Sequence, residues 1–104
     1  TYDLVLDHAT SPPPFATLPE VLDAFDHNVR AVRAALIATS DAELGAPWSL
    51  RRNGTTLLTL PRMSAFKTFV VNHTIHHRGQ LTVYLRLLDI PLPAIYGPSA
   101  DEPM

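Results

Sequence analysis

The chain has no cysteine, only four glycines, and no apolar run long enough to cross a membrane. The absence of cysteine excludes a disulfide framework and any thiolate metal site. No stretch approaches the roughly 18 apolar residues of a membrane span, and no charged-then-apolar start indicates a signal peptide. We therefore expect a cytoplasmic protein without membrane contact. Because the chain opens at Thr1 instead of methionine, we also expect that an upstream segment precedes it.

Charge is also scarce. Charged residues make up 17% of the chain, and 8 Lys+Arg against 10 Asp+Glu give a net charge of −2. A strongly basic face is therefore not expected, and nucleic acid is a poor candidate as partner. Hydrophobic residues make up 46%, which excludes wholesale disorder. The length of 104 residues fits a single domain.

Proline is abundant, and its ten positions divide the chain. None falls within residues 20–46 or 62–90. Because proline breaks helix interiors, these two windows are where long helices can form. Residues 1–16 are predicted to be a proline-rich link, and residues 90–104 an extended tail.

The first window begins with a capping box, in which Thr17 is the N-cap and Glu20 follows three residues later. The spacing predicts a helix over residues 17–39, followed by a single helical turn that starts with a second capping box at Ser40 and Glu43. The apolar stripe of the long helix is Leu18, Val21, Leu22, Phe25, Val29, Val32 and Leu36.

A β-hairpin is predicted over residues 48–60. Asn53-Gly54 favours a type I′ turn, which needs two residues at positive φ. With these two as the loop, Arg52 pairs with Thr55, and Leu50 falls opposite Leu57.

The second window predicts the longest helix, over residues 62–89. Its main stripe is Phe66, Phe69, Val70, His73, His77, Leu81, Tyr84 and Leu88. Further apolar residues widen this stripe, which is typical of a helix in the middle of a packed structure. Two helices and a hairpin cannot cover both stripes, so either upstream helices or a second copy must supply the missing partners.

His73 and His77 stand four residues apart on this helix, so both imidazoles lie on one face and can converge on one cation. A metal would satisfy one nitrogen of each ring. The competing interpretation is that the two rings are ordinary polar groups bonded to neighbours. Two histidines alone bind weakly, since a stable site usually has three protein ligands.

Neighbouring residues have several possible roles. His76 lies off the stripe and is expected at the surface or behind the ligands, whereas Gln80 can reach the histidines from one turn on. Arg78 is either a donor behind the ligands or a surface salt-bridge former. Gly79 costs helix stability, which close packing of another segment would justify. His8 could reach a metal from the proline-rich stretch.

Several metal chemistries and nucleotide motifs are excluded. A zincin needs His-Glu-x-x-His, but Thr74 follows His73. A di-iron bundle needs Glu-x-x-His motifs, and no glutamate lies between Glu43 and Glu102. No nucleophile elbow, P-loop or dinucleotide fingerprint is present. No catalytic residue can be assigned.

The stretch over residues 72–86, NHTIHHRGQLTVYLR, resembles the last-helix signature of the DinB-like (damage-inducible, YfiT-like) superfamily. The tail over residues 93–102 is similar to the ending of many members, and residues 47–50 and 60–62 also resemble the family. The similarity extends over nearly the whole chain from about Leu18.

The resemblance implies an all-α, up-down four-helix bundle of bacterial origin, commonly dimeric, to which this chain supplies two long helices and the hairpin. It implies a divalent metal that is held by three histidines, two of which are His73 and His77. Zn and Ni are the preferred candidates for this metal. The third ligand lies on an earlier helix of the family and is expected outside this chain.

The resemblance also implies a function. Some relatives are transferases that use a low-molecular-weight thiol, so a metal-dependent thiol transfer with a small-molecule substrate is expected. The alternatives are a metal-dependent hydrolase and a non-catalytic helical dimer or binding module.

Overall fold

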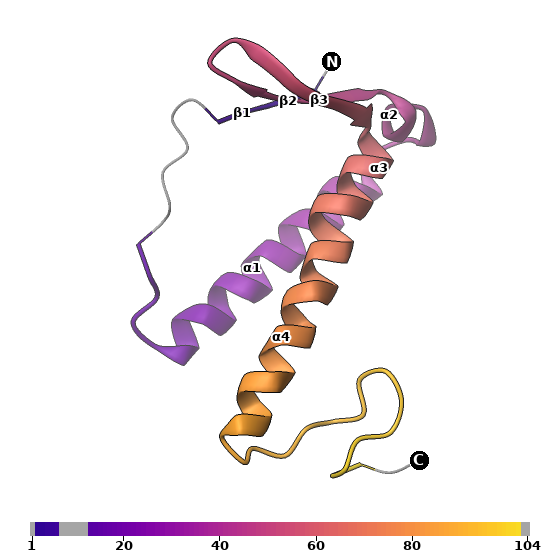
Figure 1. Ribbon diagram of the computed structural model, residues 1–104. Coiled ribbons are helices and arrows are strands. Elements are labelled where there is room, and N and C mark those ends of the chain that lie inside the picture. The colour runs from indigo at the N-terminus through magenta and orange to yellow at the C-terminus, as the bar shows by residue number, and fades with distance from the viewer. Residues whose placement is uncertain (1, 7–12, 103–104) are drawn as a thin grey trace. The chain divides into compact units, whose positions relative to one another are not determined.

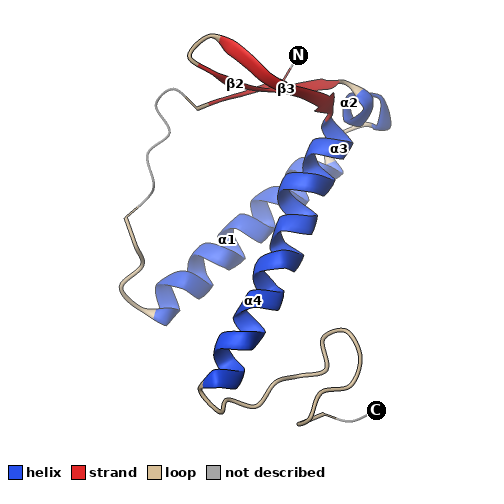
Figure 2. Cartoon of the chain, in the orientation of Figure 1, coloured by secondary structure: helices blue, strands red, loops and turns tan. Residues whose placement is uncertain are grey.

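The computed structural model describes residues 2–6 and 13–102. The chain divides into an N-terminal unit, residues 1–65, and a C-terminal unit, residues 66–104. Helices and a three-stranded sheet both contribute (Figure 1; Figure 2). The prediction of an all-α four-helix bundle is therefore wrong. The physical reason is an additional strand near the N-terminus, which extends the predicted hairpin into a mixed sheet.

The sheet has the order β1-β2-β3, with β1 at Tyr2–Val5, β2 at Pro47–Arg52 and β3 at Thr55–Pro61. β1 runs parallel to β2, with Tyr2 opposite Trp48, and β3 runs antiparallel to β2. The predicted link over residues 1–16 thus contains a strand; its residues 1 and 7–12 lie outside the described part of the chain.

The hairpin turn forms as predicted, because Asn53 and Gly54 have φ angles of 49° and 74°. Arg52 faces Thr55, which confirms the register next to the turn. Farther along, Leu50 faces Leu58 instead of the predicted Leu57. A register shift between Leu50 and Arg51 adds one residue to the β3 side, as in a β-bulge, and the turn sequence alone does not encode it.

Both predicted capping boxes are present. At the start of α1 (Leu18–Ile37), the Glu20 backbone N–H donates to Thr17 Oγ1 at 3.4 Å, and the Glu20 carboxylate accepts from the Thr17 N–H at 3.2 Å. α2 (Asp41–Gly45) starts in the same way at Ser40 and Glu43. The pKa of the Glu43 carboxyl is lowered, chiefly because it accepts hydrogen bonds from the backbone N–H and the hydroxyl of Ser40.

Arg62, the first residue of α3, makes contacts with α2 and with the sheet. Its backbone N–H donates to the Ala46 carbonyl at 2.9 Å, and its guanidinium donates to the Glu43 carbonyl at 3.4 Å. The same guanidinium lies 3.6 Å from the ring centroid of Tyr2, a cation–π distance. These contacts connect α2, β1 and the start of α3 within the N-terminal unit.

The predicted helix over residues 62–89 is helical from Arg62 to Leu87, but it is not one regular α-helix. α3 (Arg62–Phe66) leads into a π-helical segment, η1 (Lys67–Asn72), and then into α4 (His73–Leu87). Asp89, at a φ of 55°, ends it. The N–H of Ile90 donates to Leu85 O and that of Asp89 to Arg86 O, which is the Schellman pattern.

The apolar stripes remain exposed in the described chain. Ala65 is its only buried hydrophobic residue, and Ser49, whose hydroxyl lies 3.0 Å from that of Thr59, is its only buried polar one. In α1, even Leu36 is 38% exposed. The stripe around His73 is exposed as well, and the sequence predicts that helices outside this chain or a second copy cover it.

The tail is a hydrogen-bonded loop instead of the predicted extended segment. The Asp101 carboxylate accepts from Arg86 and from the Leu92 N–H, at 2.9 Å in the latter case. Glu102 accepts from the Ala94 N–H at 2.6 Å, and the Ser99 hydroxyl donates to Leu92 O at 2.7 Å. Side chains of the tail thus form hydrogen bonds within the loop and an ion pair with α4.

Candidate functional site

The two histidines predicted as metal ligands lie together at the start of α4. Their Nε2 atoms are 2.7 Å apart, and their rings are stacked with centroids 4.6 Å apart and planes inclined by 27°. The helical spacing of four residues produces this arrangement, because positions i and i+4 are neighbours on the helix surface. Both side chains are exposed, so the pair can be reached from solvent.

Gln80 orients His77, as the sequence suggested. Its Oε1 lies 2.8 Å from His77 Nδ1. A carbonyl oxygen only accepts, so Nδ1 of His77 carries the proton, and in the neutral ring Nε2 has the free lone pair. The short contact between the two Nε2 atoms then requires the proton on Nε2 of His73. This chain of bonds directs the lone pair of His77 toward its partner histidine.

The pair fits a divalent metal as two of its ligands. Two nitrogens that each lie about 2.0–2.1 Å from one ion, at a tetrahedral angle, are about 3.3 Å apart. The observed separation of 2.7 Å would have to increase by about 0.6 Å, and the proton assigned to Nε2 of His73 would have to leave that atom for the ion to bind there. The contact between His77 and Gln80 has the form common behind metal-bound histidines, whose second nitrogen donates to an oxygen.

The described residues do not complete a site by themselves. Within residues 2–6 and 13–102, no group of three or more His, Cys, Asp or Glu side chains could hold one ion. His76 lies edge-on to His77, with centroids 5.1 Å apart, and is exposed, as expected from its position off the stripe. His8 lies outside the described residues.

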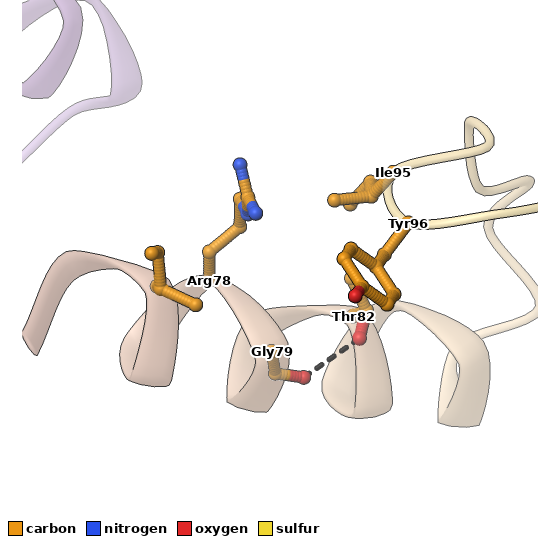
Figure 3. Close-up of a pocket in the computed structure, with 6 residues that line it drawn as sticks. Arg78, Gly79, Thr82, Ile95 and Tyr96 are labelled. Atoms are coloured by element: carbon orange, nitrogen blue, oxygen red, sulfur yellow. Dashed lines mark hydrogen bonds between the residues drawn. The ribbon is translucent and has the colours of Figure 1, made fainter. Parts of the chain in front are cut away.

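A second feature lies within the C-terminal unit and was not predicted. A pocket of about 240 Å³ is lined by six residues of α4 and the tail loop: Ile75, Arg78, Gly79, Thr82, Ile95 and Tyr96. Figure 3 shows the two tail residues beside the helix, with the Arg78 side chain rising from it. The sequence could not reveal this pocket, because residues 75–82 and 95–96 are far apart along the chain.

The close packing that would justify a glycine at position 79 is not found among the described residues. A Cβ atom built at Gly79 meets no atom within 4 Å, so no described segment packs closely there. Gly79 instead leaves open space on the helix side of the pocket. Arg78 forms no ion pair within the described part of the chain, so its predicted surface salt bridge is absent there.

No helix of the described residues is both long enough and apolar enough to span a membrane. The expected cytoplasmic location stays a prediction.

Comparison with known proteins supports the resemblance. The chain is 47% identical over 34 residues to the uncharacterized protein YrdA of Bacillus subtilis (strain 168). That match includes 33% of this chain and 20% of YrdA, so the chain spans about a fifth of the length of this curated relative. No solved structure matches the chain significantly.

The family model reaches much further. It matches residues 16–103, a range that includes both long helices, the hairpin, the histidine pair and nearly all of the tail loop. The chain therefore belongs to the DinB family.

Proposed function

We propose that this DinB-family chain binds a divalent metal ion through Nε2 of His73 and Nε2 of His77, with Zn²⁺ and Ni²⁺ as the preferred candidates. The observation that supports this most strongly is the 2.7 Å approach of the two nitrogens on one solvent-accessible helix face. The contact with Gln80 adds support, since it frees the Nε2 lone pair of His77.

The third ligand is proposed to come from outside the described residues, as a further histidine. Two imidazoles leave room for it, and the exposed helix face around the pair offers access. Imidazole suits Zn, Ni, Cu and Fe alike, so the ligand type alone does not select among these metals.

We further propose a metal-dependent transferase that uses a low-molecular-weight thiol. A divalent ion held at such a site supplies Lewis acidity, which stabilises the thiolate form of a bound thiol. The described residues would contribute the two ligands and, through Gln80, the orientation of one of them. No residue is proposed as a general base.

One observation also supports a role of the histidine pair that needs no metal. The 2.7 Å contact between the two Nε2 atoms is itself a hydrogen bond that satisfies both rings without an ion. A non-catalytic helical module would need nothing more from them.

Metal titration separates the two. Isothermal titration of the chain with Zn²⁺ and Ni²⁺ should show uptake that His73→Ala and His77→Ala each weaken at least tenfold. His27→Ala, an exposed histidine in α1, is the matched control and should bind as the parent does. Uptake that survives both pair variants would refute metal ligation by this pair.

A further inference from the structure

The pocket on α4 contains a cationic side chain, Arg78, that has no counterion among the described residues. Arg78 lines it and forms no hydrogen bond or ion pair with any described residue. The two acidic side chains of the tail have other partners, because Asp101 pairs with Arg86 and Glu102 accepts from the Ala94 N–H. A guanidinium with five donors in a planar fork matches a carboxylate, which it can bind through two parallel hydrogen bonds.

The rest of the lining is mostly apolar. Ile75 and Ile95 contribute aliphatic surface, and the fully exposed ring of Tyr96 lies at the rim beside Thr82 (Figure 3). The Thr82 hydroxyl is occupied as a donor, since it bonds to the Gly79 carbonyl at 2.6 Å. Apart from Arg78, the pocket therefore offers a ligand hydrophobic contact and aromatic stacking.

The dimensions set a limit on the ligand. A volume of about 240 Å³ lies just below the range of about 300–1,000 Å³ that is common for small-molecule sites. The open space at Gly79 lets a ligand approach the helix backbone closely. A single ring or a short chain fits this space, whereas a nucleotide or a folded peptide does not.

This pocket is separate from the histidine pair. At about 100° per residue, the mean direction of residues 75, 78, 79 and 82 differs by about 180° from that of residues 73, 77 and 80. The two features thus occupy opposite faces of the same helix, and a ligand in the pocket cannot bridge to an ion at the histidines.

We propose that this pocket binds a small carboxylate with an apolar or aromatic body. The carboxylate pairs with the Arg78 guanidinium, and the body packs between Ile75, Ile95 and the Tyr96 ring. The proposal depends on neither the metal site nor the thiol chemistry.

The test uses the full chain with benzoate as the probe and benzamide as its neutral counterpart. In ¹H–¹⁵N spectra, benzoate should shift the amides of Gly79, Thr82 and Ile95, and benzamide should bind at least tenfold more weakly. Arg78→Gln should weaken benzoate binding at least tenfold, while Arg30→Gln, an exposed arginine of α1, should leave it unchanged.

A second variant blocks the space instead of the charge. In Gly79→Leu the added Cβ meets no described atom within 4 Å, and the rest of the side chain extends toward the pocket, so this variant should abolish benzoate binding while the helix remains folded. An absence of benzoate binding at 50 mM, equal binding of benzamide, or undiminished binding by Arg78→Gln or Gly79→Leu would overturn the proposal. Equally strong binding of inorganic phosphate at the same amides would overturn the apolar part of the ligand class.

Discussion

Replacing Gln80 by leucine should weaken metal binding without removing a ligand. Gln80 Oε1 lies 2.8 Å from His77 Nδ1, and this bond holds the tautomer whose Nε2 lone pair points at His73. In Gln80→Leu the His77 ring loses that acceptor, and its proton is free to move to Nε2, where it blocks coordination. The ligand itself is still present, so binding should be weakened but not lost.

The expected loss of metal affinity in Gln80→Leu depends on the solvent exposure of the site. Removing the partner behind a metal-bound histidine typically costs about 10- to 100-fold in affinity. Because Gln80 and both histidines are exposed, water can partly replace the lost oxygen. We therefore expect the lower end, about tenfold, which corresponds to about 1.4 kcal/mol of binding free energy.

The assay is competition for Zn²⁺ against a chromophoric chelator, run in parallel on Gln80→Leu and Gln80→Glu. The glutamate variant keeps an accepting oxygen at the same reach and should retain or exceed the parental affinity. An affinity of Gln80→Leu equal to that of the parent, while His77→Ala binds poorly, would refute the orienting role. Equal loss in both Gln80 variants would refute the argument from the acceptor.

Five further outcomes are expected. Thr17→Ala removes one half of the α1 capping box and should destabilise the folded chain by about 1 kcal/mol in urea unfolding; an unchanged midpoint would contradict this. Gly79→Ala meets no atom and should raise stability by up to about 1 kcal/mol in the same assay, and a loss would mean that the helix face is covered. Asp101→Asn should speed hydrogen exchange at the Leu92 amide, which loses its charged acceptor. The pKa of the Asp101 carboxyl is lowered, first by the hydrogen bond from Arg86 and then by that from Leu92. Protection of the Leu92 amide from exchange should therefore be full above the ordinary carboxyl pKa near 3.8 and be lost as pH falls through the lowered value. Protection that increases in acid would contradict this direction. Light scattering should give the mass of a dimer, since the apolar stripes are exposed in the single chain, and a monomer at high concentration would end that expectation.

Local features could be predicted from the sequence because neighbouring residues determine them. The capping box at Thr17 and Glu20 and the turn at Asn53-Gly54 each depend on residues within one turn of chain, and both are confirmed. The pairing of His77 with Gln80 is of the same kind, since helical spacing alone brings the two side chains together.

Non-local features could not be predicted. β1 pairs with a strand more than forty residues away, and its four residues carry no signal that names a partner, so the helical resemblance led to the wrong fold class. The shift that places Leu50 opposite Leu58 and the π-helical segment before His73 likewise leave no recognisable pattern. The pocket around Arg78 needs the tail loop, whose position depends on hydrogen bonds of Asp101 and Glu102.

The central claim is that one ion can be shared by His73 and His77, and ring-nitrogen NMR tests it most directly. In long-range ¹H–¹⁵N spectra of the chain with saturating Zn²⁺, the Nε2 signals of both histidines should move together to metal-bound positions, while those of His27 stay in place. Unchanged Nε2 signals of the pair at saturating Zn²⁺, or a shift confined to other histidines, would contradict the account.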